Sequence, residues 1–544
     1  MTRTGSQSNA AIQPAVGDGP EARRIARTFL AIAGSIYALT TLGYFQSPLL
    51  DVHAFRQCQT AISATYLATD LNPLRMLTYE TPLMGAPWRI PFEFPIYQWL
   101  VAVVHRVIGL PIDQSGRLVA ITFHLACFWP LWRIVRDLGG SFVTWAILAG
   151  LFLLAPTYHH WSRSVLIEST AVFLSLEFLA CYLRWIQTRR PVPLLLACVW
   201  AAFAVLVKVT TFPAFAVAGL GLMAHDAWRR FNQGEPRRAI LIQLLVAGLP
   251  FCVALAALVP WLAVCDAVKL ENPLGAKTAS KALAAWNYGT VAQRLSWDLW
   301  GNAILLRAIP EAVGWPGLAL ILIGLWRLRG GTRTTLLVLI ALYFIPWLVF
   351  TNLHFVHNYY QCSNAIFLVA ALAVVLSEAV VRLPRAAVLI ACGGVVIGCL
   401  GASRWYLAME RDDLTDIPAY RTALFLKQVL PEDEIIVVVG SDWSSEVAFY
   451  AEKRAIYLPN WCPYDVVEKF VADPSYLSGG KTIGAMVILI PGDYPPHWDS
   501  RSNEPLIAFA KTLSAGRPPL QLDNHVTFVR KGLAWSALPE EQAP

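Results

Sequence analysis

The chain has 544 residues, of which 56% are hydrophobic and only 15% are charged. Because soluble proteins carry about 25% charged residues, this composition excludes a soluble globule and indicates a polytopic α-helical membrane protein. The net charge of +7 does not indicate nucleic-acid binding, since the basic residues cluster in short loops between apolar runs, which is a topology signal.

The chain begins with a polar segment, residues 1–22, which predicts a disordered cytoplasmic tail. The first apolar run follows Arg23, Arg24 and Arg27, so the positive-inside rule places the N-terminus in the cytoplasm. A cleaved signal peptide is the alternative for this run, but its length and the many runs after it favour a retained anchor.

Eleven apolar runs are long enough to cross about 30 Å of hydrocarbon. They lie near residues 27–49, 117–135, 142–160, 169–187, 192–208, 210–227, 239–262, 303–326, 334–351, 361–381 and 386–403. We therefore expect about eleven spans, and the odd number puts the C-terminus outside.

The loops between these runs agree with that count. Every loop placed in the cytoplasm is rich in arginine: Arg133 and Arg136; Arg184, Arg189 and Arg190; Arg229, Arg230, Arg237 and Arg238; Arg327, Arg329 and Arg333; Arg382 and Arg385. The loops placed outside hold carboxylates, which are Asp51, Glu80, Glu93, Glu168, Asp266, Glu271 and Asp298. This agreement predicts a multi-pass membrane protein with a cytoplasmic N-terminus.

One apolar stretch, Phe94–Leu110, does not fit as a span. It contains His105 and Arg106, and counting it would reverse every later loop. We expect it to form an interfacial helix on the outer surface of the membrane, with a second such helix at 56–70. The first outer loop, about 51–116, is thus predicted to be a large surface-lying structure.

The character of the sequence changes near residue 405. Segments 434–440, 485–490 and 526–530 read as strands, and segments 417–430, 444–451 and 506–513 read as helices. The alternation predicts an α/β domain outside the membrane at 405–544, after a transmembrane domain at 23–404.

Three carboxylates fall on the outer face by topology alone: Asp51 after the first span, Glu93 before the interfacial helix, and Glu168 before a later span. Basic and hydrogen-bonding side chains join them, namely His53, Arg56, His159, His160, Arg163, Lys208, His354 and His357. A carboxylate can accept a proton from a hydroxyl, and such cations can hold a leaving phosphate. The sequence thus favours a site for group transfer at the outer membrane surface.

Plainer roles exist for the same residues. Asp51 could be a solvated loop carboxylate, and Glu93 could only cap the helix after it. Arg163 and Glu168 could pair with each other, and Lys208 could extend to lipid headgroups.

The order of these motifs resembles the GT-C superfamily of polyprenyl-phosphate-sugar glycosyltransferases, in particular protein O-mannosyltransferases and the aminoarabinose transferase of lipid A. Asp51 stands where that superfamily has its catalytic Asp. Segment 92–100 (FEFPIYQWL) is similar to a Glu-Lys-Pro-Pro-Leu-Tyr-Tyr-Trp-Leu pattern, but Phe94 replaces a Lys and Ile96 replaces a Pro. Segment 162–168 resembles the second acidic loop, and 357–360 (HNYY) resembles a His-x-Tyr-Tyr segment.

The resemblance implies transfer of a sugar from a polyprenyl-phosphate donor to a hydroxyl of an envelope lipid, glycan or protein, in one inverting displacement. Asp51 would be the base, and Glu93 and Glu168 would orient substrates. The phosphate would be contacted by Arg56, Arg163, Lys208 and His357, and His53 and Tyr359 would complete the substrate site. A divalent cation, which some relatives use, stays open as a cofactor, with Asp51, Glu93 and Glu168 as its ligands.

Two other classes of protein remain alternatives. A transporter or flippase of lipid-linked glycans would also need charges at membrane depth, although transporters tend to place them near the midplane in paired repeats. A non-catalytic scaffold for envelope assembly would use the outer domain to bind partners.

Overall fold

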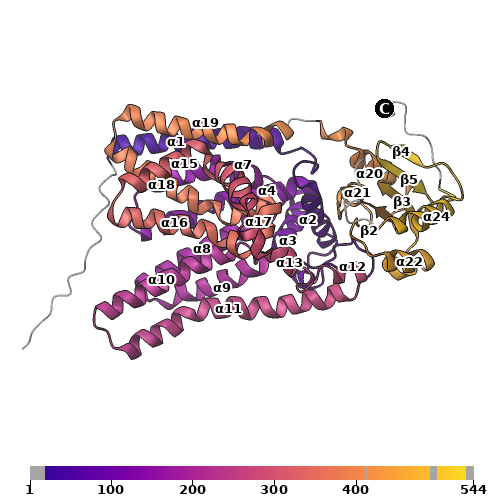
Figure 1. Ribbon diagram of the computed structural model, residues 1–544, viewed down its shortest axis with the longest axis horizontal. Helices are drawn as coiled ribbons and strands as arrows, with labels where there is room; N and C mark the ends of the chain where they lie inside the picture. Colours follow the sequence, from indigo (N-terminus) through magenta and orange to yellow (C-terminus); the bar gives the residue numbers. More distant parts are fainter. Residues whose placement is uncertain (1–18, 411–412, 441, 490–498, 534–544) are drawn as a thin grey trace, which may run out of the picture.

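The computed structural model describes residues 19–410, 413–440, 442–489 and 499–533 of the chain. A bundle of long helices forms most of the molecule, and a small sheet domain lies at one end of it (Figure 1). Most of the tail expected to be disordered, residues 1–18, lies outside the described residues, and the first helix begins at Pro20.

Eight segments of the described chain are helical and are long and apolar enough to cross a membrane. They are α1 (Pro20–Tyr44), α4 with α5 (Ile112–Ala126, Phe128–Asp137), α8 (Glu168–Thr188), α11 (Arg237–Leu270), η2 with α15 (Asp298–Ala308, Ile309–Arg327), α16 (Gly330–Val349), α18 (Ala365–Arg382) and α19 (Arg385–Met409). Each coincides with one of the predicted spans.

The three other predicted spans are also helices, but they do not reach that length or hydropathy. They are α6 (Phe142–Leu154), α9 (Pro191–Val207) and α10 (Phe212–Asn232). Pro156 interrupts the run that starts with α6, because the residue before a proline avoids helical angles, and Ala155 has ψ 120°. A short helix, α7 (Pro156–Trp161), follows. The total of eleven spans stays a prediction.

The bundle has two different ends. The start of α1 and the turn between α10 and α11 lie at the left of Figure 1, whereas α2 (Ala54–Leu67), α17 (Thr351–Val356) and the sheet domain lie toward the right. Segments far apart in the sequence therefore meet at the right end, which is where the predicted outer loops gather.

The stretch predicted to be an interfacial helix contains helix α3 (Ile96–Ile108). At 1.5 Å per residue it is about 20 Å long, which is too short to cross about 30 Å of hydrocarbon. It packs against α2 and α4 and leaves Val107 and Ile108 exposed. This geometry fits a helix that lies on the membrane, which remains our prediction for it.

The sheet domain holds five strands in the order β2-β1-β3-β5-β4. Three strands are parallel, namely β2 (Ala455–Leu458), β1 (Ile435–Val439) and β3 (Ile483–Leu489). Strand β5 (His525–Val529) pairs antiparallel with both β3 and β4 (Leu520–Leu522). Strand β1, which lies between β2 and β3, reads Ile-Ile-Val-Val-Val and is buried throughout, as expected for a strand covered on both faces.

Helices cover both faces of this sheet. Helices α20 (Pro418–Val429) and α21 (Glu446–Tyr450) share a buried cluster with Ile436 and Val438 of β1. Helices α22 (Tyr464–Ala472) and α24 (Asn503–Ser514) share another with the alternate residues, Val437 and Val439. The domain is thus an α/β layer structure.

The remaining elements are short. They are η1 (Pro73–Leu77), α12 (Pro273–Ala276), α13 (Ala284–Tyr288), α14 (Val291–Arg294), η3 (Asn358–Ser363), η4 (Leu414–Asp416), α23 (Ser475–Ser478) and η5 (Ser500–Ser502).

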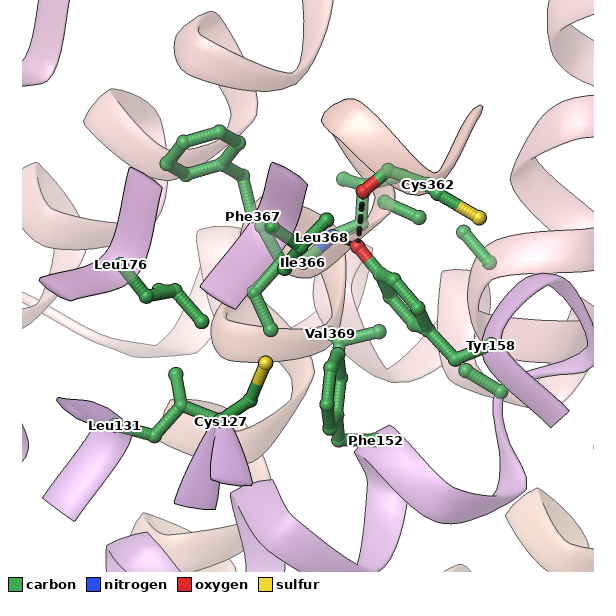
Figure 2. Close-up of a cluster of buried hydrophobic side chains, with 14 of the residues drawn as sticks. Cys127, Leu131, Phe152, Tyr158, Leu176, Cys362, Ile366, Phe367, Leu368 and Val369 are labelled. Carbon is green, nitrogen blue, oxygen red and sulfur yellow. Dashed lines mark hydrogen bonds between the residues drawn. The ribbon is translucent and has the colours of Figure 1, made fainter. Parts of the chain in front are cut away.

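A buried hydrogen bond fixes η3 against the bundle. Figure 2 shows the ring of Tyr158 from α7 near Phe152, with its hydroxyl donating to the carbonyl oxygen of Cys362 at 2.8 Å. The same hydroxyl accepts from the backbone N–H of Ile366 at 2.9 Å. Since η3 carries Tyr359, the packing of this cluster sets where that side chain lies.

Candidate active site

Asp51 is buried in the loop between α1 and α2, with 4% of its surface exposed. Its Oδ2 accepts a short hydrogen bond from the hydroxyl of Tyr44, and its Oδ1 accepts one from Nε2 of Gln57 at 2.5 Å. The Oε1 of Gln57 in turn accepts from the backbone N–H of Val165 at 3.0 Å. The carboxylate therefore has a fixed orientation set by the end of α1 and the start of α2.

Two buried arginines place positive charge beside this carboxylate. The guanidinium carbons of Arg117 and Arg163 lie 3.9 and 5.2 Å from the ring centre of Tyr44. Arg117 is fully buried and donates to the carbonyl oxygen of Ser47 at 2.7 Å. A buried carboxylate needs such compensation to remain charged.

Arg56 and Glu93 form a second charged pair near the same loop. Nη2 of Arg56 donates to Oε2 of Glu93 at 2.8 Å, and the side chains are 16% and 9% exposed. Nε2 of Gln98 donates to the other carboxylate oxygen of Glu93 at 2.7 Å. Although burial opposes the charge of Arg56, the nearby Glu93 raises the pKa of the guanidinium, so Arg56 stays cationic.

Glu168 and Lys208 form a third pair, at the ends of α8 and α9. Nζ of Lys208 donates a short bond to Oε1 of Glu168, and both side chains are buried. The ammonium lies 4.1 Å from the ring centre of Tyr360 and 5.1 Å from that of Tyr359. Lys208 thus does not extend to lipid headgroups, and Glu168 pairs with it and not with Arg163.

The tyrosines of η3 connect the second and third pairs. The rings of Tyr359 and Tyr360 are stacked with centroids 4.7 Å apart. Burial raises the pKa of Tyr360 to about 12, and the positive charge of Arg56 acts in the opposite direction. Arg56, Lys208 and the two phenols therefore belong to one electrostatic neighbourhood.

His53 and His357 lie together beside these tyrosines. Their ring centroids are 5.2 Å apart, and His53 lies 4.9 Å from Tyr359. A hydrogen bond of 2.9 Å joins Nε2 of His53 to Oδ1 of Asn358. Burial lowers the pKa of His53 to about 4 and that of His357 to about 3. Both imidazoles are therefore neutral near pH 7, and His357 could contact a phosphate only as a neutral donor.

Arg163, which the sequence places at the phosphate, has a different partner in the structure. Its Nη1 and Nη2 donate to the two carboxylate oxygens of Glu410 at 3.2 and 2.9 Å. Nδ1 of His160 lies 2.9 Å from Oε1 of the same residue. Burial alone would raise the pKa of Glu410, but the bonds from His160 and Arg163 lower it overall. Arg163 therefore contributes charge near Tyr44 while it is held by Glu410.

Several residues of this neighbourhood are not apparent from the sequence. Tyr44, Gln57 and Arg117 lie near the ends of predicted helices, and the charge of Arg117 at a membrane boundary could have signalled a site. Glu410 gives no such signal, because it follows the last span. Lys269 is also near, with its ammonium 4.7 Å from the ring centre of Phe92, the residue before Glu93.

The three carboxylates do not share one ligand set. Asp51 is bound by Tyr44 and Gln57, Glu93 by Arg56 and Gln98, and Glu168 by Lys208. Across the described parts of the chain, no group of three or more His, Cys, Asp or Glu side chains gathers as metal ligands do. The residues proposed as ligands thus do not fit a common cation, and no step is assigned to one.

Comparison with protein families gives one match, over part of the chain. Residues 91–264 match the family model described as dolichyl-phosphate-mannose-protein mannosyltransferase. The match starts two residues before Glu93 and extends past Glu168 and Lys208. It confirms the resemblance to the GT-C glycosyltransferases that the motifs predicted.

Comparison with solved structures gives particular neighbours. The chain is similar to ArnT from Cupriavidus metallidurans bound to undecaprenyl phosphate, with TM-score 0.56, 15% identity, and coverage of 92% of this chain and 97% of that one. The apo state of the same ArnT gives TM-score 0.57, 15% identity, and coverage of 92% and 98%. No curated protein sequence matches the chain significantly. At this identity the likeness shows a shared fold over nearly the whole chain.

Proposed function

We propose that this protein is an integral-membrane glycosyltransferase of the bacterial inner membrane. It takes a sugar from a polyprenyl monophosphate and passes it to a hydroxyl of an envelope lipid, glycan or protein on the outer face. The observation that supports this most strongly is the position of two buried carboxylate–cation pairs, Arg56–Glu93 and Lys208–Glu168. Both pairs lie near Tyr359 and Tyr360, beside the loop of Asp51. A neighbour in fold binds undecaprenyl phosphate, which supports this class of donor.

The cations suit a leaving phosphate. A sugar linked to a prenyl phosphate is a diester with one negative charge, and the released monoester gains a second. Arg56 and Lys208 therefore interact more strongly with the leaving group as the bond breaks, which lowers the barrier. Lys269 and Arg56 both lie against the ring of Phe92, so Lys269 can supply a further positive charge beside Glu93. It stands in for the lysine that Phe94 replaces in the resembling motif.

Asp51 is the general base of this proposal. As the acceptor oxygen bonds to the anomeric carbon, its proton passes to the Asp51 carboxylate, and the bond from that carbon to the phosphate oxygen breaks. Each oxygen of Asp51 accepts one bond in the structure, which leaves lone pairs for the incoming proton. A single displacement of this kind inverts the anomeric centre.

The decisive test is sugar transfer by purified protein in nanodiscs from a labelled prenyl-phosphate donor. General-base assistance contributes about 10²–10⁴-fold, so Asp51→Asn should lower turnover by that factor while donor binding persists. Asp70→Asn is the matched control, because Asp70 is exposed in the same outer loop. A flippase would form no covalent product even in the wild type. Wild-type turnover in Asp51→Asn would show that Asp51 is not the base.

A further inference from the structure

The loop that carries Asp51 has a strained backbone conformation. His53 has φ +54°, in the left-handed region, although it is not a glycine. Such conformations are unfavourable for a residue with a side chain and persist only where the surroundings hold them. The loop therefore needs partners that fix it on both sides of Asp51.

The bundle supplies one set of partners. Arg117 donates to the carbonyl oxygen of Ser47, and Asn358 bonds the ring of His53. These contacts come from α4 and η3.

The sheet domain supplies another set, all from helix α21 and the residue before it. The hydroxyl of Tyr450 accepts from the backbone N–H of Leu49 at 2.5 Å. The hydroxyl of Ser445 donates to the carbonyl oxygen of Phe55, also at 2.5 Å. The two bonds reach the chain two residues before Asp51 and four residues after it. They join positions 401 and 390 residues apart in sequence.

Helix α21 is itself anchored firmly. The ring of Tyr450 packs edge-on against Tyr420 of α20, with centroids 4.7 Å apart. The hydroxyl of Tyr457 on β2 accepts from the N–H of Ala448 at 3.3 Å.

The first outer loop also bonds to the sheet domain. Backbone N–H groups of Ala455 and Tyr457 donate to the carbonyl oxygens of Pro82 and Leu83, both at 2.9 Å. A segment of the first outer loop thus lies along the edge of β2 and joins the sheet domain to the loop that follows Asp51.

We propose that Ser445 and Tyr450 form a clamp that positions the Asp51 loop for catalysis, so that the sheet domain is part of the active-site framework. This inference rests on the proposed transferase function. Tyr450 and Ser445 act through the loop backbone and are positioning residues. A small displacement of a reacting group can cost as much as 10²-fold in rate, so loss of one bond should lower turnover by roughly 10- to 100-fold.

The first experiment measures hydrogen–deuterium exchange of peptides covering residues 45–56. Tyr450→Phe keeps the ring but removes the hydroxyl, so exchange should rise there. Tyr420→Phe is the control, since it retains the same aromatic packing and should leave exchange unchanged. Equal exchange in the wild type and Tyr450→Phe would overturn the clamp whether or not the protein transfers sugar.

The second experiment measures kcat and KM for the donor in Tyr450→Phe, Ser445→Ala and Ser445→Thr. The first two should lower kcat with little change in KM, and Ser445→Thr, which keeps the hydroxyl, should recover turnover. In the Asp51→Asn background, Tyr450→Phe should have little further effect, because a positioning residue has no role once the base is gone.

The outcomes separate the two hypotheses. Equal rate losses from Tyr450→Phe with and without Asp51, or no loss, would overturn the clamp and leave the transferase function intact. No transfer by the wild type would overturn the function, and the exchange measurement alone would then decide whether α21 orders the loop.

Discussion

Lys208 and Glu168 hold opposite charges in the interior, with side chains 8% and 2% exposed. Separating such a pair is costly, because one charge then remains buried without compensation, typically at about 3–5 kcal/mol. The pair can therefore serve stability, substrate binding or both, and single substitutions cannot distinguish these roles.

A double substitution can distinguish a stabilising role of Lys208 from a role in substrate binding. Lys208→Met alone should lower the melting temperature and abolish most transfer, since Glu168 is left unpaired. Adding Glu168→Gln removes the orphaned charge and should restore much of the melting temperature. Transfer should stay low in the double variant, because the phosphate still lacks its cation. Recovery of transfer together with stability would show that Lys208 has only a structural role.

His53 and His357 make stability depend on pH. Burial lowers the pKa of His53 to about 4 and that of His357 to about 3 in the folded chain. Below pH 6.5 these two histidines therefore become protonated in the unfolded chain but stay neutral in the folded chain. Stability is therefore lost as pH falls through 6.5, by up to about 2 kcal/mol per histidine at pH 5.

Thermal unfolding at pH 7 and pH 5 measures this effect. The melting temperature should fall at pH 5, and the fall should shrink in a His53→Gln, His357→Gln variant. His225→Gln is the control, because His225 is exposed on α10 and should leave the pH dependence unchanged. An identical fall in all three proteins would assign the effect to other groups.

At the scale of residues, sequence reasoning found candidate groups but not their partners. Asp51, Arg56 and Glu93 could be predicted as site residues from the sequence, because charged side chains at membrane boundaries are unusual. The pairing of Arg163 with Glu410 was not, since the two are 247 residues apart and only the folded chain brings them together. The same holds for Lys269 near Glu93.

At the scale of elements, hydropathy located every predicted span as a helix, because long apolar runs have few other solutions in a membrane. Strands β2 and β4 were missed, since β2 has 4 residues and β4 has 3, too few for a clear pattern. The contact of segment 82–84 with β2 was equally hidden, because it depends on a strand that comes about 370 residues later.

Helix α3 offers a direct test of the membrane assignment. Cysteines introduced at Arg89 and Asp113, which flank α3 and are partly exposed, should both react with an impermeant thiol reagent from outside. A cysteine at Gln233, in the turn between α10 and α11, should not. Reaction at only one of the flanking positions would mean that α3 crosses the membrane.

At the scale of the whole molecule, the sheet domain and the turn between α10 and α11 lie at opposite ends (Figure 1). The arginine-rich turns predict which end faces the cytoplasm. An alkaline phosphatase fused after Pro544 should therefore be active in cells, and one fused at Gln233 should be inactive. The reverse result would place the Asp51 loop in the cytoplasm and exclude an outer-face donor.

The pairing of the first outer loop with the sheet domain also sets an order of events during synthesis. Glu80 and its partner Arg454 are 374 residues apart, and chains grow at about 5–20 residues per second. The outer loop therefore leaves the ribosome roughly 20–75 s before the strand that covers it. For most of that interval Ser445 and Tyr450 have not been synthesised, so the Asp51 loop gains its full set of contacts only after the last quarter of the chain has been made and folded.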